Sequence, residues 1–208
     1  MADEHIQTVI IGGGQSGLAM SYCLMQRGLP HVVLERGQVG ERWRTRWDSV
    51  TLQFPNSRTR LPGSRSPGAH PDGFLSREEV VRWLEDYAAS FNPPLRNGVT
   101  VTGLTQLPDS SHYLVETTAG AIEATNVIIA SGPYQVPDLP AAASAVPSDI
   151  FQLHSETYRN PEQLPPGAVL VVGSGASGSQ IAEELLNSGR QVYLSVGRHR
   201  RLPRRYRG

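Results

Sequence analysis

The sequence contains no lysine and only one cysteine, Cys23, among its 208 residues. A single cysteine excludes an internal disulfide framework, a cysteine-rich zinc site and a CxxC redox pair. Without lysine, the chain has neither the phosphate-binding lysine of a P-loop nor a lysine that forms a Schiff base with a substrate. These absences exclude several common kinds of catalytic site.

Long hydrophobic runs and a secretion signal are also missing. No apolar run approaches the roughly 18 residues that a membrane-spanning helix needs. The chain begins with acidic residues, Asp3 and Glu4, rather than the basic residues that open a signal peptide. We therefore expect a cytoplasmic protein with no transmembrane segment.

Neither sign of charge is in excess, because 19 basic residues balance 19 acidic ones. This balance argues against a nucleic-acid-binding protein, which normally has a basic surface. The distribution is uneven, since residues 198–208 hold six arginines and no acid. Three interpretations of this basic segment stay open: a bound phosphate group, simple solvation, and attraction to an anionic polymer or membrane.

One local pattern is present twice: an apolar strand, a glycine-rich turn, a helix and a second strand. The first copy is expected at residues 6–11, 12–17, 18–27 and 31–35. The second copy is expected at residues 168–172, 173–178, 179–188 and 191–196. Units of this kind build parallel sheets covered by helices, so the sequence predicts an α/β fold.

Each turn has the spacing GxGxxG, which indicates a Rossmann-like dinucleotide site when it joins a strand to a helix. The first glycine permits the tight turn, the second admits a pyrophosphate, and the third lets the helix pack on the strand. The phosphates then bind the N-terminus of the helix. The candidate contacts are Gly12, Gly13, Gly14, Gln15, Ser16 and Gly17, and then Gly173, Ser174, Gly175, Ala176, Ser177 and Gly178.

The residue after the second strand distinguishes the two copies. Glu35 follows Gly12 by 23 residues, and an acid there binds a ribose diol, which suits FAD or NAD. The same interval after Gly173 reaches Val196, with Arg198 and Arg200 close behind it. Guanidinium groups suit the 2′-phosphate of NADP. The alternatives are an exposed acid at the strand end and a solvated arginine tail.

The stretch between the two copies predicts three further features. Residues 40–74 lack a regular period and indicate a long ordered loop. A helix begins at Ser76, whose spacing to Glu79 is that of a capping box. Alternating residues within 99–124 predict a small β-meander, with strands expected at 99–107, 112–118 and 121–124, and a separate buried strand at 126–130.

A proline-rich stretch at residues 133–166 marks the expected boundary between two domains. Residues 1–150 are expected to form a Rossmann-like domain that carries the loop and the meander. Residues 151–208 are expected to form the start of a second Rossmann-like domain, which is incomplete.

Four segments in order carry a family resemblance. They are Gly12–Gly17 with Glu35, residues 40–48 with Leu52–Pro55, Ala130–Gly132 with Pro137 and Pro140, and Phe151–Tyr158. Together they resemble the flavin-dependent monooxygenases that combine an FAD-binding and an NADP-binding domain. This group includes flavin-containing N/S-monooxygenases, YUCCA-type and Baeyer–Villiger enzymes, and bacterial homologues called "flavoprotein involved in potassium transport".

The resemblance assigns FAD to the first domain and NADPH to the second. It implies further FAD contacts at Glu35, Arg36, Arg42, Trp43, Trp47, Val101, Ser131 and Gly132. It also makes Gln53 and Asn56 candidates for polar contacts near the reacting ring. The alternatives are ordinary loop anchoring for the tryptophans, turn chemistry for Gln53 and Asn56, and a core position for Val101.

The resemblance further implies a reaction. NADPH reduces FAD, and the reduced flavin forms a C4a-hydroperoxide with O₂ that transfers one oxygen atom to a small organic substrate. No metal is expected, because the six histidines show no ligand spacing such as HxxxH. The alternatives are an FAD/NAD(P)H oxidoreductase without oxygenation and a catalytically inactive nucleotide-binding fragment.

The chain also departs from the family pattern. Gln152 and Leu153 interrupt the FxG part of the fourth segment, and Tyr158 stands where Baeyer–Villiger enzymes usually have tryptophan. These differences favour an N/S-monooxygenase or a YUCCA-like enzyme. The chain is shorter than family members, so we expect a truncated protein or a half that needs its C-terminal part, with a homo-oligomer as another possibility.

Overall fold

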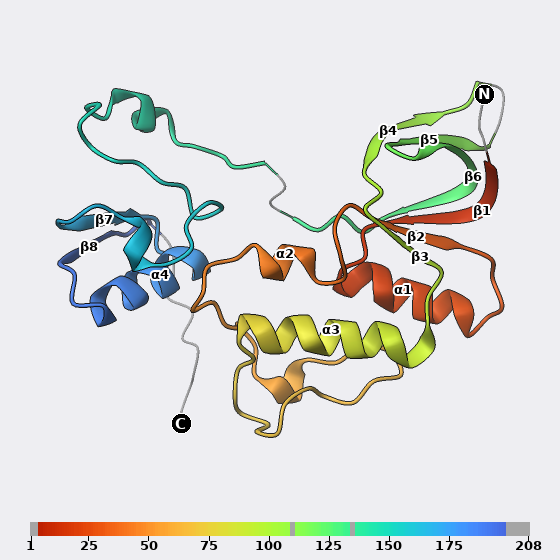
Figure 1. Ribbon diagram of the computed structural model, residues 1–208, viewed down its shortest axis with the longest axis horizontal. Helices are drawn as coiled ribbons and strands as arrows, with labels where there is room; N and C mark the ends of the chain where they lie inside the picture. Colours follow the sequence, from red (N-terminus) through yellow and green to blue (C-terminus); the bar gives the residue numbers. More distant parts are fainter. Residues whose placement is uncertain (1–3, 109–110, 134–135, 199–208) are drawn as a thin grey trace.

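The computed structural model describes residues 4–108, 111–133 and 136–198 (Figure 1). Arg200 and the arginines that follow it lie outside the described residues. Figure 1 shows two units at opposite ends of the molecule, with the N-terminal sheet in one and the glycine turn of the second copy in the other. The predicted α/β class is confirmed.

The first unit is built on a six-stranded sheet with the order β3-β2-β1-β6-β5-β4. The four strands from β3 to β6 in this order run parallel, and β5 and β4 are antiparallel additions. Their bounds are β1 Glu4–Ile11, β2 Val32–Glu35, β3 Leu95–Asn97, β4 Val101–Gln106, β5 Tyr113–Thr117 and β6 Gly120–Ile129.

Two main helices and a long loop cover one face of this sheet. The helices of this unit are α1 Gln15–Met25, the short α2 Glu41–Arg44 and α3 Arg77–Phe91. Ser76 accepts a hydrogen bond from the Glu79 backbone, and Glu79 accepts one from the Ser76 N–H, so the predicted capping box is confirmed. Leu18 of α1 packs with Leu84 of α3 and with Leu61 and Leu75 of the loop.

The other face of the parallel strands is covered by the antiparallel part. Val9, Val32 and Leu34 pack there against Val115 and Ile122, and all five side chains are buried. The parallel strands therefore have apolar cover on both faces, as their continuous hydrophobic runs require.

Three details differ from the sequence expectations. The last strand of the expected meander, 121–124, and the strand expected at 126–130 are one continuous strand, β6, which pairs with β5 in its first half and with β1 over most of its length. Strand β3 was not predicted, because three residues are too few to show a period. The expected loop 40–74 contains α2 and a 3₁₀ turn at Asn56–Arg58.

The second unit is a strand–helix–strand of β7 Val169–Val172, α4 Ala176–Asn187 and β8 Val192–Ser195, together with the preceding residues 151–168, whose Leu153, Tyr158 and Leu164 pack on it. Its two strands form a separate parallel sheet, and α4 covers one face of it. Short 3₁₀ turns at Ala141–Ala145 and Pro161–Gln163 interrupt the proline-rich stretch before it. Within the described part of the chain, no helix is both long and apolar enough to span a membrane.

Candidate functional site

The first glycine turn lies where β1 passes into α1. Gly12 has φ of +113° and donates its N–H to the Leu34 carbonyl of β2 at 2.8 Å. A Cβ on Gly12 would overlap the Ala130 carbonyl oxygen, and one on Gly17 would overlap the Gly12 carbonyl oxygen. The first and third glycines of the motif are therefore required by the close packing of α1 against the sheet.

Gly14 lies in a different environment. A Cβ placed on it would meet no atom within 4 Å. Its φ of −86° is accessible to other residues, and it caps α1 without any side-chain hydrogen bond. The open space in front of an uncapped helix N-terminus is the feature that lets an anionic group approach the backbone. Gln15 and Ser16 are exposed beside it.

Glu35 ends β2 next to this turn. Its side chain is buried, and its carboxylate accepts hydrogen bonds from the Gly13 N–H at 2.7 Å and the Gly37 N–H at 3.0 Å. The alternative of an exposed strand-end acid is therefore wrong. Each carboxylate oxygen can accept a second hydrogen bond, so both remain able to bind a hydroxyl group of a ribose.

The second glycine turn repeats the geometry of the first. Gly173 has φ of +102° and donates its N–H to the Ser195 carbonyl of β8 at 3.0 Å. A Cβ on Gly178 would overlap the Gly173 carbonyl oxygen, whereas one on Gly175 would meet nothing within 4 Å. Gly175 caps α4 without a side-chain hydrogen bond, as Gly14 caps α1.

The two turns differ in the residue that follows the second strand. Gly12 bonds to Leu34 and Gly173 bonds to Ser195, so Val196 occupies the place of Glu35. Val196 and Arg198 are both exposed, and no acid stands between them. The second site therefore lacks the carboxylate of the first and has a guanidinium group close to it in sequence.

The other predicted FAD contacts fall into two groups. Ser131 and Gly132 follow β6, whose end lies against Gly12, and Arg36 is exposed directly after Glu35. These three residues border the first glycine turn. Val101 lies at the start of β4 and packs at the edge of the apolar cluster between the sheet layers.

The tryptophans of the predicted loop join the two units. Trp47 is 2% exposed and packs with Tyr158, Ile181 and Leu185 of the second unit, with Trp43 at the edge of this cluster. The indole N–H of Trp47 is buried without a hydrogen-bond partner among the described residues. The flavin contact expected for Trp43 and Trp47 stays a prediction.

Asn56, predicted as a polar contact, is buried inside the loop. Its amide donates to the His70 carbonyl at 2.9 Å, and its side-chain oxygen accepts no hydrogen bond within the described part of the chain. Gln53 is exposed three residues earlier. The two residues therefore lie in different environments, since Gln53 is exposed and Asn56 is buried. Their role near a reacting ring stays a prediction.

Arg42, also predicted as an FAD contact, forms a bidentate ion pair with Glu156, which joins the two units. Partial burial alone would raise the pKa of Glu156. The hydrogen bonds and positive charge of Arg42, with Arg46 and His154 nearby, outweigh burial and hold that pKa below its usual value.

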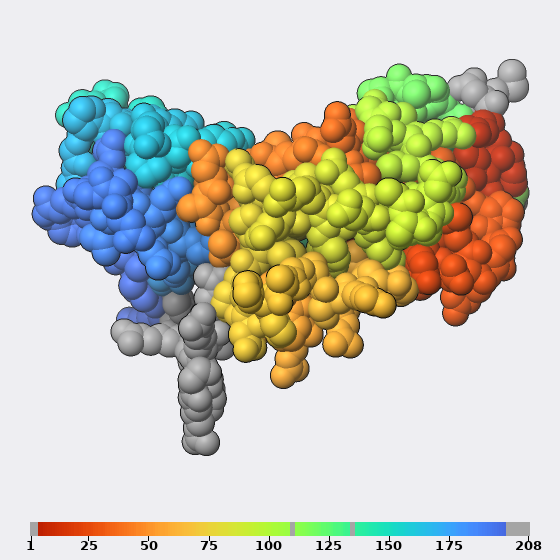
Figure 2. Space-filling view, turned by 60° about the horizontal axis from the view of Figure 1, so that its bottom comes forward, coloured from red at the N-terminus to blue at the C-terminus, as the bar shows by residue number. Residues whose placement is uncertain are grey.

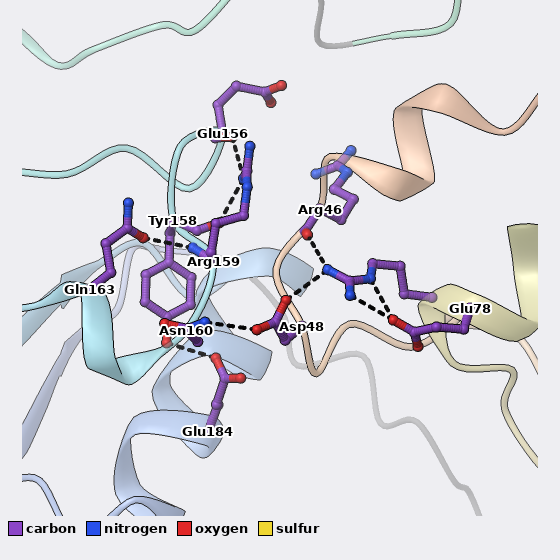
Figure 3. A network of polar contacts seen from close by, with 10 residues as sticks. Arg46, Asp48, Glu78, Glu156, Tyr158, Arg159, Asn160, Gln163 and Glu184 are labelled. Atoms are coloured by element: carbon purple, nitrogen blue, oxygen red, sulfur yellow. Dashed lines mark hydrogen bonds and ion pairs between the residues drawn. The ribbon is translucent and has the colours of Figure 1, made fainter. Parts of the chain in front are cut away.

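Residues 45–51 are fixed to the second unit by further polar contacts (Figure 3). Asp48 accepts hydrogen bonds from Asn160 at 2.8 Å and from Arg77 at 2.7 Å. The bond from Asn160 and the nearby arginine charge lower the pKa of Asp48. Figure 3 also shows Tyr158 donating its hydroxyl to Glu184 of α4 at 2.7 Å.

A further polar contact between the two units is made by the side-chain amide of Gln180. Gln180 of α4 accepts from the Thr51 N–H at 3.1 Å and donates to the Thr51 carbonyl at 3.3 Å. Sequence reasoning missed both Gln180 and Glu156, because each partner lies more than 100 residues away. Neither residue forms a local motif that could have indicated the contact.

The comparison with known proteins agrees with this geometry. Residues 9–206, nearly the whole chain, match the pyridine nucleotide-disulphide oxidoreductase family. The chain belongs to this family. An uncharacterized CzcO-like oxidoreductase of Geobacillus kaustophilus is 39% identical over 196 residues, which cover 93% of this chain and 55% of the relative. Family membership here does not depend on a redox cysteine pair, because the sequence contains only Cys23.

Monooxygenases are also among the similar proteins. Indole-3-pyruvate monooxygenase YUCCA1 of Oryza sativa subsp. japonica is 32% identical over 191 residues, which cover 90% of this chain and 47% of the relative. The solved flavin-containing monooxygenase of Stenotrophomonas maltophilia is 27% identical, with a TM-score of 0.79 over 94% of this chain and 59% of that one. The predicted resemblance is confirmed, and the chain spans about half the length of the curated relatives it matches.

Proposed function

We propose that this chain is the nucleotide-binding part of a flavin-dependent monooxygenase, with FAD at the first glycine turn and NADPH at the second. The observation that carries this proposal is the pair of geometrically equivalent turns that differ at one position, Glu35 in the first and Val196 in the second. Similarity to monooxygenases in sequence and fold supports the reaction class.

The residues at the first turn fit FAD. The open face of Gly14 leaves room for a pyrophosphate at the N-terminus of α1. Glu35 is already oriented by Gly13 and Gly37, so its remaining lone pairs are directed without further ordering toward a ribose diol. When bound, the flavin supplies the redox chemistry; this chain's residues bind it and orient it.

The residues at the second turn fit a phosphorylated nicotinamide cofactor. Gly175 provides the open approach to the N-terminus of α4. Arg198 lies two residues beyond Val196 and is the described cation closest in sequence to the expected 2′-phosphate. Arg200, which lies outside the described residues, remains a second proposed partner.

The contacts around Trp47 have a role in this proposal. A hydride passes between two cofactors only when their reacting rings are brought close together in a fixed orientation. Residues 45–51 contact both the start of α3 in the first unit and α4 in the second, and would thereby hold the two glycine turns in a fixed relation. Figure 2 shows the orange and yellow residues filling the space between the red and blue ends.

Two matched substitutions test the assignment of cofactors. Gly14→Ala and Gly175→Ala each add a methyl group where the chain leaves space, so both variants should fold. We expect Gly14→Ala to weaken FAD binding by roughly tenfold or more, since the methyl group blocks the pyrophosphate, and Gly175→Ala to weaken only NADPH binding. Flavin absorbance after desalting and NADPH fluorescence titration measure the two affinities.

Either of two results would overturn the proposal: wild-type chain that retains no flavin when supplied with FAD, or equal effects of both substitutions on both cofactors. An oxidoreductase that does not oxygenate is distinguished by the next measurement. Oxygen consumption and peroxide release during NADPH oxidation favour the monooxygenase, whereas NADPH oxidation that needs an added electron acceptor favours the alternative.

A further inference from the structure

A cluster of metal-ligand side chains lies apart from both glycine turns. His5 of β1, Glu123 of β6 and His112 just before β5 place their ligand atoms within 4.8 Å of one another. The glycine turn follows the carboxyl end of β1, whereas His5 lies near its amino end. The cluster is therefore separated from the nucleotide sites by most of the length of a strand.

The register of the sheet brings these residues together. His5 lies opposite Glu123 in the parallel pair of β1 and β6, and Glu123 lies opposite Leu114 in the antiparallel pair of β6 and β5. His112 is two residues before Leu114 and therefore projects from the same face. Three adjacent strands thus each supply one ligand, which no spacing rule along the sequence could reveal.

The three side chains already contact one another. His112 Nδ1 is hydrogen-bonded to a carboxylate oxygen of Glu123 at 2.6 Å, and the rings of His5 and His112 have centroids 5.4 Å apart. His5 is exposed, while the other two are half-buried. Ligands of a tetrahedral ion with bonds of about 2.1 Å lie roughly 3.4 Å apart. Small side-chain rotations that separate His112 from Glu123 and bring His5 closer would therefore admit an ion.

We propose that His5, His112 and Glu123 form a binding site for a first-row divalent transition metal, with Zn²⁺ as the representative ion. Two imidazoles and one carboxylate are a donor set that suits zinc, cobalt and nickel, and the exposed side of His5 leaves a coordination position for water. The ion would join β1, β6 and β5, and thereby fasten the antiparallel strands to the parallel sheet.

Calorimetric titration of Zn²⁺ into the tag-free chain, after treatment with a chelator, tests the proposal. We expect one equivalent to bind, and Co²⁺ to give a visible absorption band in the same protein. His5→Gln and His112→Gln should each weaken binding by more than about tenfold, since each removes one of three ligands. His70→Gln, at an exposed histidine in the loop, is the matched control and should leave binding unchanged.

Thermal unfolding separates loss of a ligand from loss of the fold. Zn²⁺ should raise the melting temperature of the wild-type chain and of His70→Gln, but not of His5→Gln, whose exposed side chain can be replaced without loss of packing. Absence of stoichiometric binding would overturn the proposal. Binding that survives both His5→Gln and His112→Gln would do the same, because the ion would then lie elsewhere.

Discussion

At the scale of single residues, the same residue type has different roles within one motif. Gly12 and Gly17 are needed because the sheet and helix leave no room for a side chain, whereas Gly14 is bordered by open space. Gly12 and Gly17 are therefore constrained by folding, and Gly14 is the position that we propose for binding. The same division holds for Gly173, Gly178 and Gly175 in the second turn.

Glu35→Ala should weaken FAD binding by about 5- to 150-fold. The substitution removes the proposed ribose contact and leaves the Gly13 and Gly37 N–H groups without their acceptor, at a cost of roughly 1–3 kcal/mol. Flavin fluorescence titration measures the affinity. Glu116→Ala, at an exposed acid of β5, is the control. An unchanged affinity in Glu35→Ala would refute the ribose contact.

Arg198→Ala should raise the KM for NADPH much more than the KM for NADH. Loss of one charge-assisted hydrogen bond to the 2′-phosphate costs about 1.5–3 kcal/mol, which is roughly a 10- to 150-fold change. Steady-state kinetics with both cofactors make the comparison, and Arg82→Ala, at an exposed arginine of α3, serves as control. Equal changes for NADPH and NADH would show that Arg198 does not contact the phosphate.

At the scale of elements, the docking of α4 depends on a buried tyrosine. Burial and the neighbouring Glu184 carboxylate raise the pKa of Tyr158, so its hydroxyl stays protonated as a donor at neutral pH. Tyr158→Phe should lower the free energy of unfolding by about 1.5 kcal/mol, typical of a hydrogen bond to a charged group. Tyr193→Phe, at a tyrosine that is 54% exposed, should change it by less than about 0.5 kcal/mol.

The pH dependence gives this prediction a second readout. The folded pKa of Tyr158 lies above the unfolded value, so its contribution is complete below about pH 10 and is lost as the pH rises further. Chemical unfolding measured between pH 7 and 11 should show the stability difference between wild type and Tyr158→Phe shrinking at the alkaline end. A difference that grows with pH would contradict the proposed donor role.

The helices and strands show which parts of the fold could be predicted from the sequence. The two strand–turn–helix units, the helix cap at Ser76 and the positions of both glycine turns were predictable, because each depends on neighbours within a few residues. The continuity of β6 was not, because the strand extends beyond its neighbour β5 by pairing with β1, which lies far away in the sequence. Strand β3 exists only because β2 provides an edge for it.

The candidate site also has a part that could be predicted from the sequence and a part that could not. Glu35 and its neighbouring turn could be located by counting along the chain, since a βαβ unit fixes that interval. The ion pair of Arg42 with Glu156 and the burial of Trp47 against α4 depend on how two distant units pack. No local sequence pattern indicates that packing. The cluster of His5, His112 and Glu123 was hidden for a different reason, because it depends on the register of neighbouring strands in the first sheet.

At the scale of the whole molecule, the two units meet at the apolar cluster around Trp47. On the second unit, α4 leaves the opposite face of the β7–β8 sheet exposed, including Leu170, Val172 and Tyr193. Parallel sheets are normally covered on both faces. Polar contacts add to the Trp47 cluster in holding the units together, among them Arg42 with Glu156 and Thr51 with Gln180.

The Arg42–Glu156 pair should make this arrangement sensitive to acid. Its net effect on Glu156 is a lowered pKa, so the pair stabilises the fold above the unfolded pKa of about 4.3, and this contribution is lost as the pH falls through the lower folded value. Glu156→Gln should lower the melting temperature by about 2–4 °C at pH 7, for roughly 1 kcal/mol, and the difference should shrink as the pH falls below the unfolded pKa.

Glu85→Gln is the matched control, because Glu85 pairs with Arg44 at the surface of the first unit and does not reach the second. If the Arg42–Glu156 pair fixes the two units together, Glu156→Gln should also increase protease cleavage in the proline-rich stretch of residues 136–150, while Glu85→Gln should not. Equal cleavage of the two variants would mean that the pair adds stability to the loop without controlling how the units are held.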